Sequence, residues 1–150
     1  MTDVSLDPQD KASIPISGGG PRFVARRVLI VDDDRSVREL FRRCLLLAGY
    51  DVSVASGGAE GLQALGTDPT IGLVLLDLDM PRIDGRRFRE VQRTDPRLEA
   101  IPTVVITGTN LTDDVRRELR ATDYLSKPVQ REQLVALVER YLPESAPATK

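Results

Sequence analysis

The sequence contains no histidine and no tryptophan, and it has a single cysteine, Cys44. Without histidine, the chain cannot form a Ser-His-Asp or Cys-His nucleophilic site, a histidine general base or a histidine-ligated zinc site. One cysteine excludes an intramolecular disulfide and any metal site made of several thiolates. Chemistry in this protein must therefore rest on carboxylate, ammonium, guanidinium or hydroxyl side chains.

An excess of one charge is also missing, because 21 basic residues face 23 acidic ones, for a net charge of −2. Nucleic-acid binding needs a concentrated basic surface, so we expect no nucleic-acid partner. No apolar run is long enough to span a bilayer, and residues 1–20 lack the apolar segment of a signal peptide. We expect no membrane partner and a cytoplasmic location, which suits a free thiol.

The length of 150 residues and the hydrophobic content of 41% predict one domain with one core. Residues 1–25 carry three prolines and the run Gly18-Gly19-Gly20, and residues 143–150 carry two prolines. Such segments bury too little apolar surface to offset their chain entropy. We predict a flexible arm over 1–25, a folded domain over 26–142 and a flexible tail over 143–150.

Within the folded domain, short β-branched runs alternate with segments of helical periodicity. Strands are expected over 28–31, 51–55, 71–76, 103–106 and 124–125, and helices over 37–48, 58–66, 85–94, 112–120 and 130–141. In the first helix, Val37, Leu40, Phe41 and Cys44 predict the buried face. This alternation predicts an α/β fold, a doubly wound parallel sheet with helices on both faces. Ligands of such sheets bind at the carboxyl ends of the strands.

Polar side chains follow four of these strands. The first ends in Asp32-Asp33-Asp34, the third in Asp77 and Asp79, and the fourth in Thr107, while Lys127 follows the fifth. Close carboxylates repel one another unless a cation or a proton is supplied, and Mg²⁺ prefers carboxylate oxygens while keeping waters. A carboxylate can also act as a nucleophile that accepts a phosphoryl group. The set therefore predicts a phosphoryl-transfer site.

Each residue of the set also has a simpler interpretation. Asp34 fits a helix N-cap, Asp77 a turn residue, Thr107 a partner of local backbone, and Lys127 a residue of an ordinary loop. What favours the site is that all of them fall at strand ends and in one chain order. The acidic run also exceeds what capping requires, because a helix needs one cap.

The ordered motifs resemble the receiver domain of two-component response regulators. They are Val28-Leu-Ile-Val-Asp-Asp-Asp34, Leu75-Leu-Asp-Leu-Asp-Met-Pro81 with Asp84-Gly85, Val105-Ile-Thr-Gly108 and Tyr124-Leu-Ser-Lys-Pro128. The resemblance runs from Arg26 to Leu142. It implies a flavodoxin-like fold with strand order 2-1-3-4-5 and five helices, of which the fourth is short.

The resemblance also implies roles for the site residues. Asp77 would be the phospho-acceptor, phosphorylated by a sensor histidine kinase or a histidine phosphotransfer protein. Asp32, Asp33, Asp77 and the backbone carbonyl of Asp79 would hold Mg²⁺ (or Mn²⁺). Lys127 and Thr107 would contact the phosphoryl group. Tyr124 would be a switch aromatic that turns inward when Thr107 moves; the alternative is a half-buried strand residue with its hydroxyl in water.

No effector domain fits after Leu142, so the resemblance implies a stand-alone regulator that signals through an unknown output protein. We expect a monomer or a phosphorylation-dependent dimer, and no turnover enzyme. Arginines around the third helix suggest either a docking patch or, as the favoured reading, a solvated helix face: Arg82, Arg86, Arg87, Arg89 and Arg93.

Three features depart from the family pattern. Gly108 stands where the family more often has alanine or serine. The stretch from Thr107 to Tyr124 is slightly short, with Arg120-Ala121-Thr122 in place of the usual Gly-Ala, which predicts a truncated or displaced fourth helix. Asp79 and Thr109 occupy the positions that tune phosphorylation lifetime, and the charge of Asp79 predicts slow uptake from small anionic phosphodonors.

Two other functions remain open. Asp77-Leu78-Asp79 resembles the first motif of haloacid-dehalogenase-type phosphatases, but Pro81 stands where that motif has a hydroxyl residue, and a late pair of acids is missing. A pseudo-receiver, a binding module that no longer uses phosphate, is kept open by the altered segment 107–123.

Overall fold

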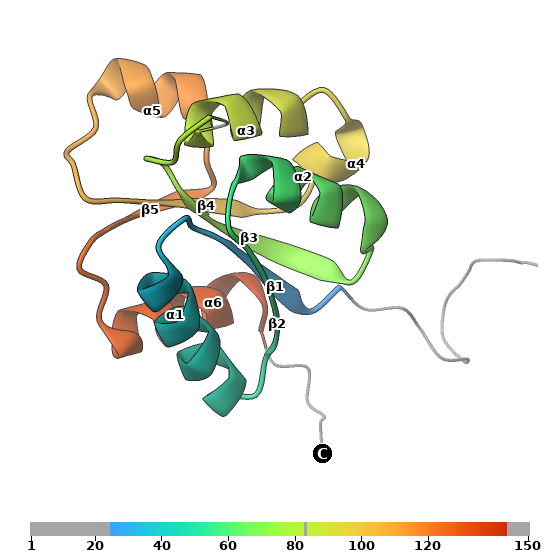
Figure 1. Cartoon of the computed structure of the whole chain (residues 1–150), viewed down its shortest axis with the longest axis vertical. Helices are drawn as coiled ribbons and strands as arrows, with labels where there is room; N and C mark the ends of the chain where they lie inside the picture. The colour runs from blue at the N-terminus through green and yellow to red at the C-terminus, as the bar shows by residue number, and fades with distance from the viewer. Residues whose placement is uncertain (1–24, 83, 144–150) are drawn as a thin grey trace, which may run out of the picture.

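The computed structural model describes residues 25–82 and 84–143 (Figure 1). In this part of the chain, five parallel strands form one sheet in the order β2-β1-β3-β4-β5. The strands are β1 (Arg27–Val31), β2 (Asp51–Ala55), β3 (Ile71–Asp77), β4 (Thr103–Thr107) and β5 (Asp123–Ser126). The predicted α/β fold and strand order are thus confirmed. The predicted arm and tail lie almost entirely outside the described residues and stay predictions.

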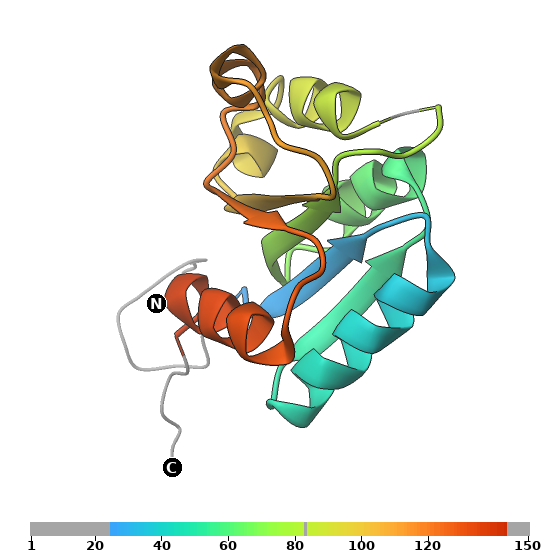
Figure 2. The same ribbon diagram turned by 90° about the vertical axis from the view of Figure 1, so that its left-hand side faces the viewer.

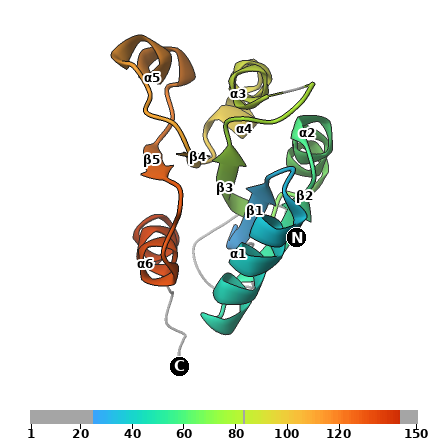
Figure 3. The same cartoon turned by 60° about the vertical axis from the view of Figure 1, so that its left-hand side comes forward.

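Helices cover both faces of the sheet (Figures 1 and 3). One face carries α1 (Arg35–Leu47) and α6 (Arg131–Tyr141), and the other carries α2 (Gly58–Thr67), α3 (Gly85–Gln92), α4 (Pro96–Glu99) and α5 (Asp113–Leu119). Successive side chains along each strand point to opposite faces of the sheet and pack into two apolar clusters, one under each helical layer. The central strand β3 is buried over its whole length, as a strand between two helical layers must be.

The number of helices differs from the expected five, because the described residues contain six. The additional helix is the single turn α4, which begins where the Asp95 side chain accepts a hydrogen bond from the Arg97 amide and Pro96 occupies the first turn. A four-residue helix is too short to show periodicity in a sequence. The helix expected over 112–120 is α5, and at seven residues it is indeed short.

Local capping explains where α1 begins and ends. The Asp34 carboxylate accepts hydrogen bonds from the amides of Ser36 and Val37, as an N-cap does. After the helix, Gly49 has a φ of 98°, a conformation that favours glycine. Leu40 was expected on the buried face, but it is 57% exposed, because it lies at the edge of the stripe that buries Phe41 and Cys44.

All five strands point the same way, so their carboxyl ends lie along one edge of the sheet (Figure 2). The loops after β1, β3, β4 and β5 therefore meet at that edge. Among the described residues, no helix combines the length and the apolar content that crossing a bilayer requires.

Candidate functional site

Three carboxylates meet where β1 and β3 end. Asp32 and Asp33 directly follow β1, and Asp77 is the last residue of β3, the strand paired with β1. Each offers a carboxylate oxygen that lies within 4.8 Å of the other two. Asp32 and Asp77 are 2% and 5% exposed, whereas Asp33 is open to solvent. The arrangement is a small anionic pocket with one exposed wall.

The Lys127 ammonium joins the two buried carboxylates. Its Nζ lies 3.3 Å from Asp32 Oδ2 and 3.4 Å from Asp77 Oδ1. The lysine is placed by its own backbone, whose amide donates to the Thr107 carbonyl at 2.8 Å. Backbone amides complete the pocket, since Asp34 N donates to Asp32 Oδ1 and Asp79 N to Asp77 Oδ1. Residues from the ends of β1, β3 and β5 thus share one cluster.

Burial and charge together shift the titration of this cluster. Burial, reinforced by the charge of Asp32, raises the pKa of Asp77 to about 6, against the lowering effect of Lys127 and the Asp79 amide. Burial acts to lower the pKa of Lys127, but the carboxylates of Asp32 and Asp77 outweigh it and raise that pKa. At neutral pH, Asp77 is therefore largely ionised, although burial and the charge of Asp32 destabilise this ionised form. A bound cation would stabilise it.

Thr107 brings a hydroxyl to the neighbouring strand end. It is buried at the end of β4, and its Oγ1 donates to Asp79 Oδ2 at 3.4 Å. The same hydroxyl contacts Thr109 Oγ1 at 3.1 Å and accepts from the Thr109 amide at 3.2 Å. The family resemblance implies a metal-ligating backbone carbonyl at Asp79, and the contact of the Asp79 side chain with Thr107 was not expected. The pair Asp79 and Thr107 is 28 residues apart, and only strand order brings it together.

Tyr124 lies on β5, half-buried, with its hydroxyl directed to α5. That hydroxyl donates to the Arg116 carbonyl at 3.0 Å and accepts from the Ala121 amide at 3.3 Å. The Arg116 guanidinium lies over the ring, 4.5 Å from its centroid. The half-buried strand position of the alternative interpretation is present, but the hydroxyl also has backbone partners in the protein. The switch role of Tyr124 stays a prediction. In this arrangement, Tyr124 is bound to α5 through the carbonyl and the guanidinium of Arg116.

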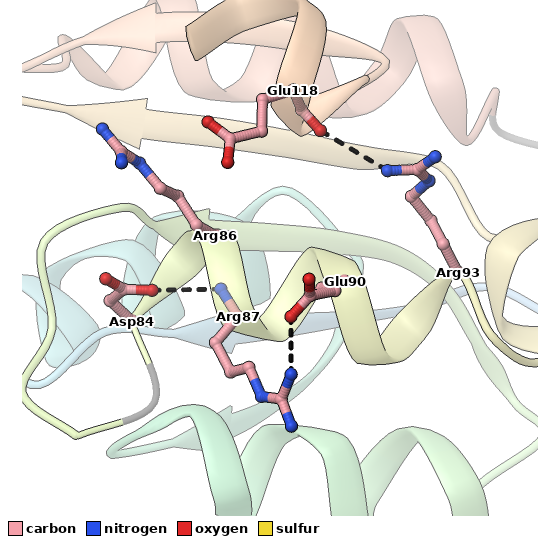
Figure 4. A pocket seen from close by; sticks show the side chains of 6 residues that line it. All are labelled: Asp84, Arg86, Arg87, Glu90, Arg93 and Glu118. Carbon is pink, nitrogen blue, oxygen red and sulfur yellow. Dashed lines mark hydrogen bonds and ion pairs between the residues drawn. The ribbon is translucent and has the colours of Figure 1, made fainter.

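The arginines around α3 do not form one solvated face. Arg86 and Arg87 are exposed and line a shallow pocket with Asp84, Glu90, Arg93 and Glu118 (Figure 4). Arg89, in contrast, is 5% exposed, and Gln92 is fully buried. Sequence reasoning missed both. Gln92 stands four residues after Phe88, the apolar anchor of the helix, and this spacing is the signal that places Gln92 on the inner face. Arg89 directly follows Phe88, so its spacing from Phe88 gives no such signal.

Comparisons with known proteins agree with this geometry. The family model of the response regulator receiver domain matches residues 28–139. The response regulator MprA of Mycobacterium bovis (strain BCG / Pasteur 1173P2) is 39% identical over 127 residues, which cover 80% of this chain and 54% of that protein. MprA of Mycobacterium leprae (strain TN) is 37% identical over 124 residues, covering 81% and 53%. The chain spans about half the length of these curated relatives.

Solved structures show the same likeness. The chemotaxis response regulator CheY4 of Vibrio cholerae superposes with a TM-score of 0.71 at 28% identity, covering 79% of this chain and 100% of that chain. The receiver domain of sensor histidine kinase PA1611 from Pseudomonas aeruginosa PAO1, solved with a magnesium ion in its active site cleft, has a TM-score of 0.71 and covers 81% and 100%. At 22% identity, that second likeness is one of fold. By its family model, its relatives and its site, the chain belongs to the response regulator receiver family.

Proposed function

We propose that the protein is a phosphorylation-dependent signalling switch in which Asp77 accepts a phosphoryl group from a histidine kinase or a histidine phosphotransfer protein. The observation that carries the proposal is the pairing of a buried, ionisable carboxylate with an ammonium 3.4 Å away and with a second buried carboxylate. An attacking carboxylate oxygen and a cation for the incoming phosphoryl oxygens are the two groups that phosphoryl transfer needs.

The donor set fits a hard divalent cation, Mg²⁺ or Mn²⁺. It consists of carboxylate oxygens alone, close enough to share one ion, with Asp33 providing a solvent-facing side. Asp32, Asp33 and Asp77 would hold the ion, with the backbone carbonyl of Asp79 as a further oxygen. When bound, the ion supplies positive charge to the phosphoryl oxygens and relieves the repulsion among the acids.

The transfer itself is a displacement at phosphorus. An oxygen of Asp77 forms a bond to the phosphorus of the partner's phosphohistidine as the phosphorus–nitrogen bond breaks. The imidazole leaves with the electron pair and takes up a proton. Lys127, already within reach of Asp77, can turn its ammonium to the new phosphoryl oxygens. Water attack on the acyl phosphate would reset the switch.

The new group adds a charge of roughly −2 and strong hydrogen-bond acceptors beside Thr107. The Thr107 hydroxyl has one proton to donate, and its partners in this structure are Asp79 and Thr109. Donation to the phosphoryl group would take the proton from these partners, so we expect the loop after β4 to reorganise. Tyr124 is the proposed switch aromatic, which would release α5 as Thr107 moves.

We further propose that the output is a protein–protein contact made by the rearranged face, in the cytoplasm, by a monomer or a phosphorylation-dependent dimer. A nucleic-acid or membrane partner is not part of the proposal, and neither is turnover as an enzyme. Action without a further domain stays a prediction, because the curated relatives are about twice as long as the matched segment.

Beryllofluoride, which imitates an acyl phosphate, tests the proposal. With Mg²⁺, it should shift the amide resonances of Thr107 and Lys127 in the wild-type protein. Without Mg²⁺, or in the variant Asp77→Asn, those shifts should be absent. A folded wild-type protein that shows no Mg²⁺-dependent response would support a pseudo-receiver instead.

A further inference from the structure

The carbonyl end of α5 is held by side chains of two other elements. Arg89 of α3 donates from Nε to the Leu119 carbonyl at 2.9 Å and from a terminal nitrogen to the Arg120 carbonyl. Tyr124 of β5 donates to the Arg116 carbonyl, one turn earlier. A cation at the carbonyl end of a helix is favourable because the helix dipole is negative there. Arg89 and Tyr124 therefore hold neighbouring turns of the same short helix.

The Arg89 side chain is held in place by Gln92 of the same helix. Its remaining terminal nitrogen donates to Gln92 Oε1 at 2.8 Å. The Gln92 amide in turn donates to the Leu98 carbonyl at 2.9 Å and to Thr103 Oγ1 at 3.0 Å. A buried guanidinium is tolerated only when its donors are paired, as these are. The carbonyl end of α5 is thus attached to α3, to α4 and to the start of β4.

Among the described residues, no hydrogen bond or ion pair joins the start of α5 to α3. This end is linked to Thr107 by residues 108–112, of which Leu111 packs against the apolar cluster under α3 and the other four are exposed. A side chain added at Gly108 would meet nothing within 4 Å. A movement of Thr107 therefore reaches α5 through this loop, whereas the hydrogen bonds of Arg89 hold the far end of the helix.

We propose that Arg89 is a positioning residue that holds α5, and with it the carbonyl bound by Tyr124, in the resting arrangement of the switch. The inference rests on the proposed function. Because Arg116, Leu119 and Arg120 lie within about one turn, α5 cannot follow Thr107 without stretching the Arg89 hydrogen bonds. Tyr124 keeps its acceptor until they break. The Arg89 contacts thus favour the resting state, and weakening them should shift the population towards the activated one.

A beryllofluoride titration of the full chain in the presence of Mg²⁺ tests this, with the Tyr124 ring followed by carbon-13 NMR. In Arg89→Met, we expect the half-saturating beryllofluoride concentration to fall at least about threefold, since ligands bind more tightly when the competent state is more populated. The free variant should already show the Tyr124 signal displaced towards its bound position.

The matched control is Arg86→Met, the same replacement on the same helix. Arg86 is exposed, and its guanidinium makes no hydrogen bond or ion pair with the part of the chain that the structure describes. Figure 4 draws no bond between Arg86 and the other residues that line the pocket, whereas it marks the bond from Arg93 to Glu118. Its half-saturating concentration should match that of the wild type. A second readout needs no variant: in the wild-type protein, the Arg89 Nε–H signal should exchange slowly with solvent and become faster when beryllofluoride binds.

Two results would overturn the inference while leaving the proposed function intact. One is a folded Arg89→Met that responds at Thr107 and Lys127 with an unchanged or higher half-saturating concentration. The other, decisive even if Arg89→Met fails to fold, is an Arg89 Nε–H equally protected in both states of the wild type. A wild-type protein without any response to beryllofluoride overturns the proposed function and this inference together.

Discussion

Asp77 combines three properties at one side chain: it is buried, it faces a second buried carboxylate, and it lies within reach of an ammonium. Each property follows from its place at the end of the central strand. Burial and the charge of Asp32 raise its pKa, and Lys127 keeps that pKa from rising further. The result is a carboxylate that is ionised at neutral pH yet disfavoured in that form, so a cation or a phosphoryl group with its cation relieves it.

The pKa of about 6 predicts how Asp77 titrates in the metal-free protein. Its carboxyl should take up a proton as the pH falls through about 6, well above the ordinary value of 3.8. The carbon-13 resonance of the Asp77 carboxyl, followed without Mg²⁺ between pH 3 and pH 8, measures this. A midpoint near pH 4 would contradict the raised pKa.

The charge of Asp79 should slow the uptake of small anionic phosphodonors. Replacing it, Asp79→Asn, removes one like charge beside the pocket and leaves an acceptor for Thr107. At about 1 kcal/mol for a charge pair at contact distance in water, the rate with acetyl phosphate should rise about fivefold. Asp51→Asn, an exposed acid at the opposite end of the sheet, is the control and should have no effect. An unchanged rate in Asp79→Asn argues against the hypothesis of slow uptake.

At the residue level, the sequence allows the convergence of Asp32, Asp33, Asp77 and Lys127 to be predicted, because parallel strands end at one edge. Their roles stay predictions. The contact of Asp79 with Thr107 could not be foreseen, since it depends on the direction that one side chain takes. The same holds for the Tyr124 hydroxyl, which donates to the Arg116 backbone carbonyl. Every residue has such a carbonyl, so no residue type in the sequence indicates this contact.

Among the elements, the regular ones follow from periodicity and the irregular ones do not. The five strands and the helices of eight or more residues lie where the apolar pattern places them. The single turn α4 depends on one cap and one proline, too little for a pattern. Arg89 illustrates the same limit in α3. A charged residue on an arginine-rich helix is expected to face solvent, and only the position of α5 shows that Arg89 is buried.

The start of α1 separates a structural acid from the acids of the pocket. Asp34 caps the helix, so Asp34→Ala should lower the free energy of unfolding by about 1 kcal/mol and leave Mg²⁺ affinity within about twofold. Asp33→Ala should do the reverse, weakening Mg²⁺ binding at least about tenfold with little change in stability. Urea denaturation and calorimetric titration measure the two effects. If Asp34→Ala lost Mg²⁺ binding instead, the division of roles would be wrong.

At the scale of the whole molecule, the ionised Asp77 lowers the free energy of unfolding, because its charged form is less stable in the folded protein than in the unfolded chain. The pKa of Asp77 is raised from 3.8 to about 6, so its contribution favours folding at low pH and is lost as the pH rises through about 6. Without Mg²⁺ at pH 7.5, Asp77→Asn should therefore increase the free energy of unfolding by about 1–3 kcal/mol. Below about pH 4, where the wild-type carboxyl is protonated, the difference should vanish. Urea denaturation at the two pH values measures it, and a destabilised Asp77→Asn at pH 7.5 would contradict this account.

The absence of histidine from the sequence agrees with the proposed function. Under the proposed function, the phosphoryl group comes from a histidine outside these 150 residues, and the receiver itself contributes the acceptor carboxylate, an ammonium and a hydroxyl. The parallel strands bring these groups to one edge of the sheet.

The most direct test is the intact mass of the protein after incubation with phosphoramidate and Mg²⁺ at pH 7.5. The account predicts one added phosphoryl group in the wild-type protein and none in Asp77→Asn. It also predicts that the group is lost in neutral hydroxylamine, as an acyl phosphate is. An Asp77→Asn protein that still takes up the phosphoryl group, or a folded wild-type protein that never does, would contradict the assignment of Asp77 as the acceptor.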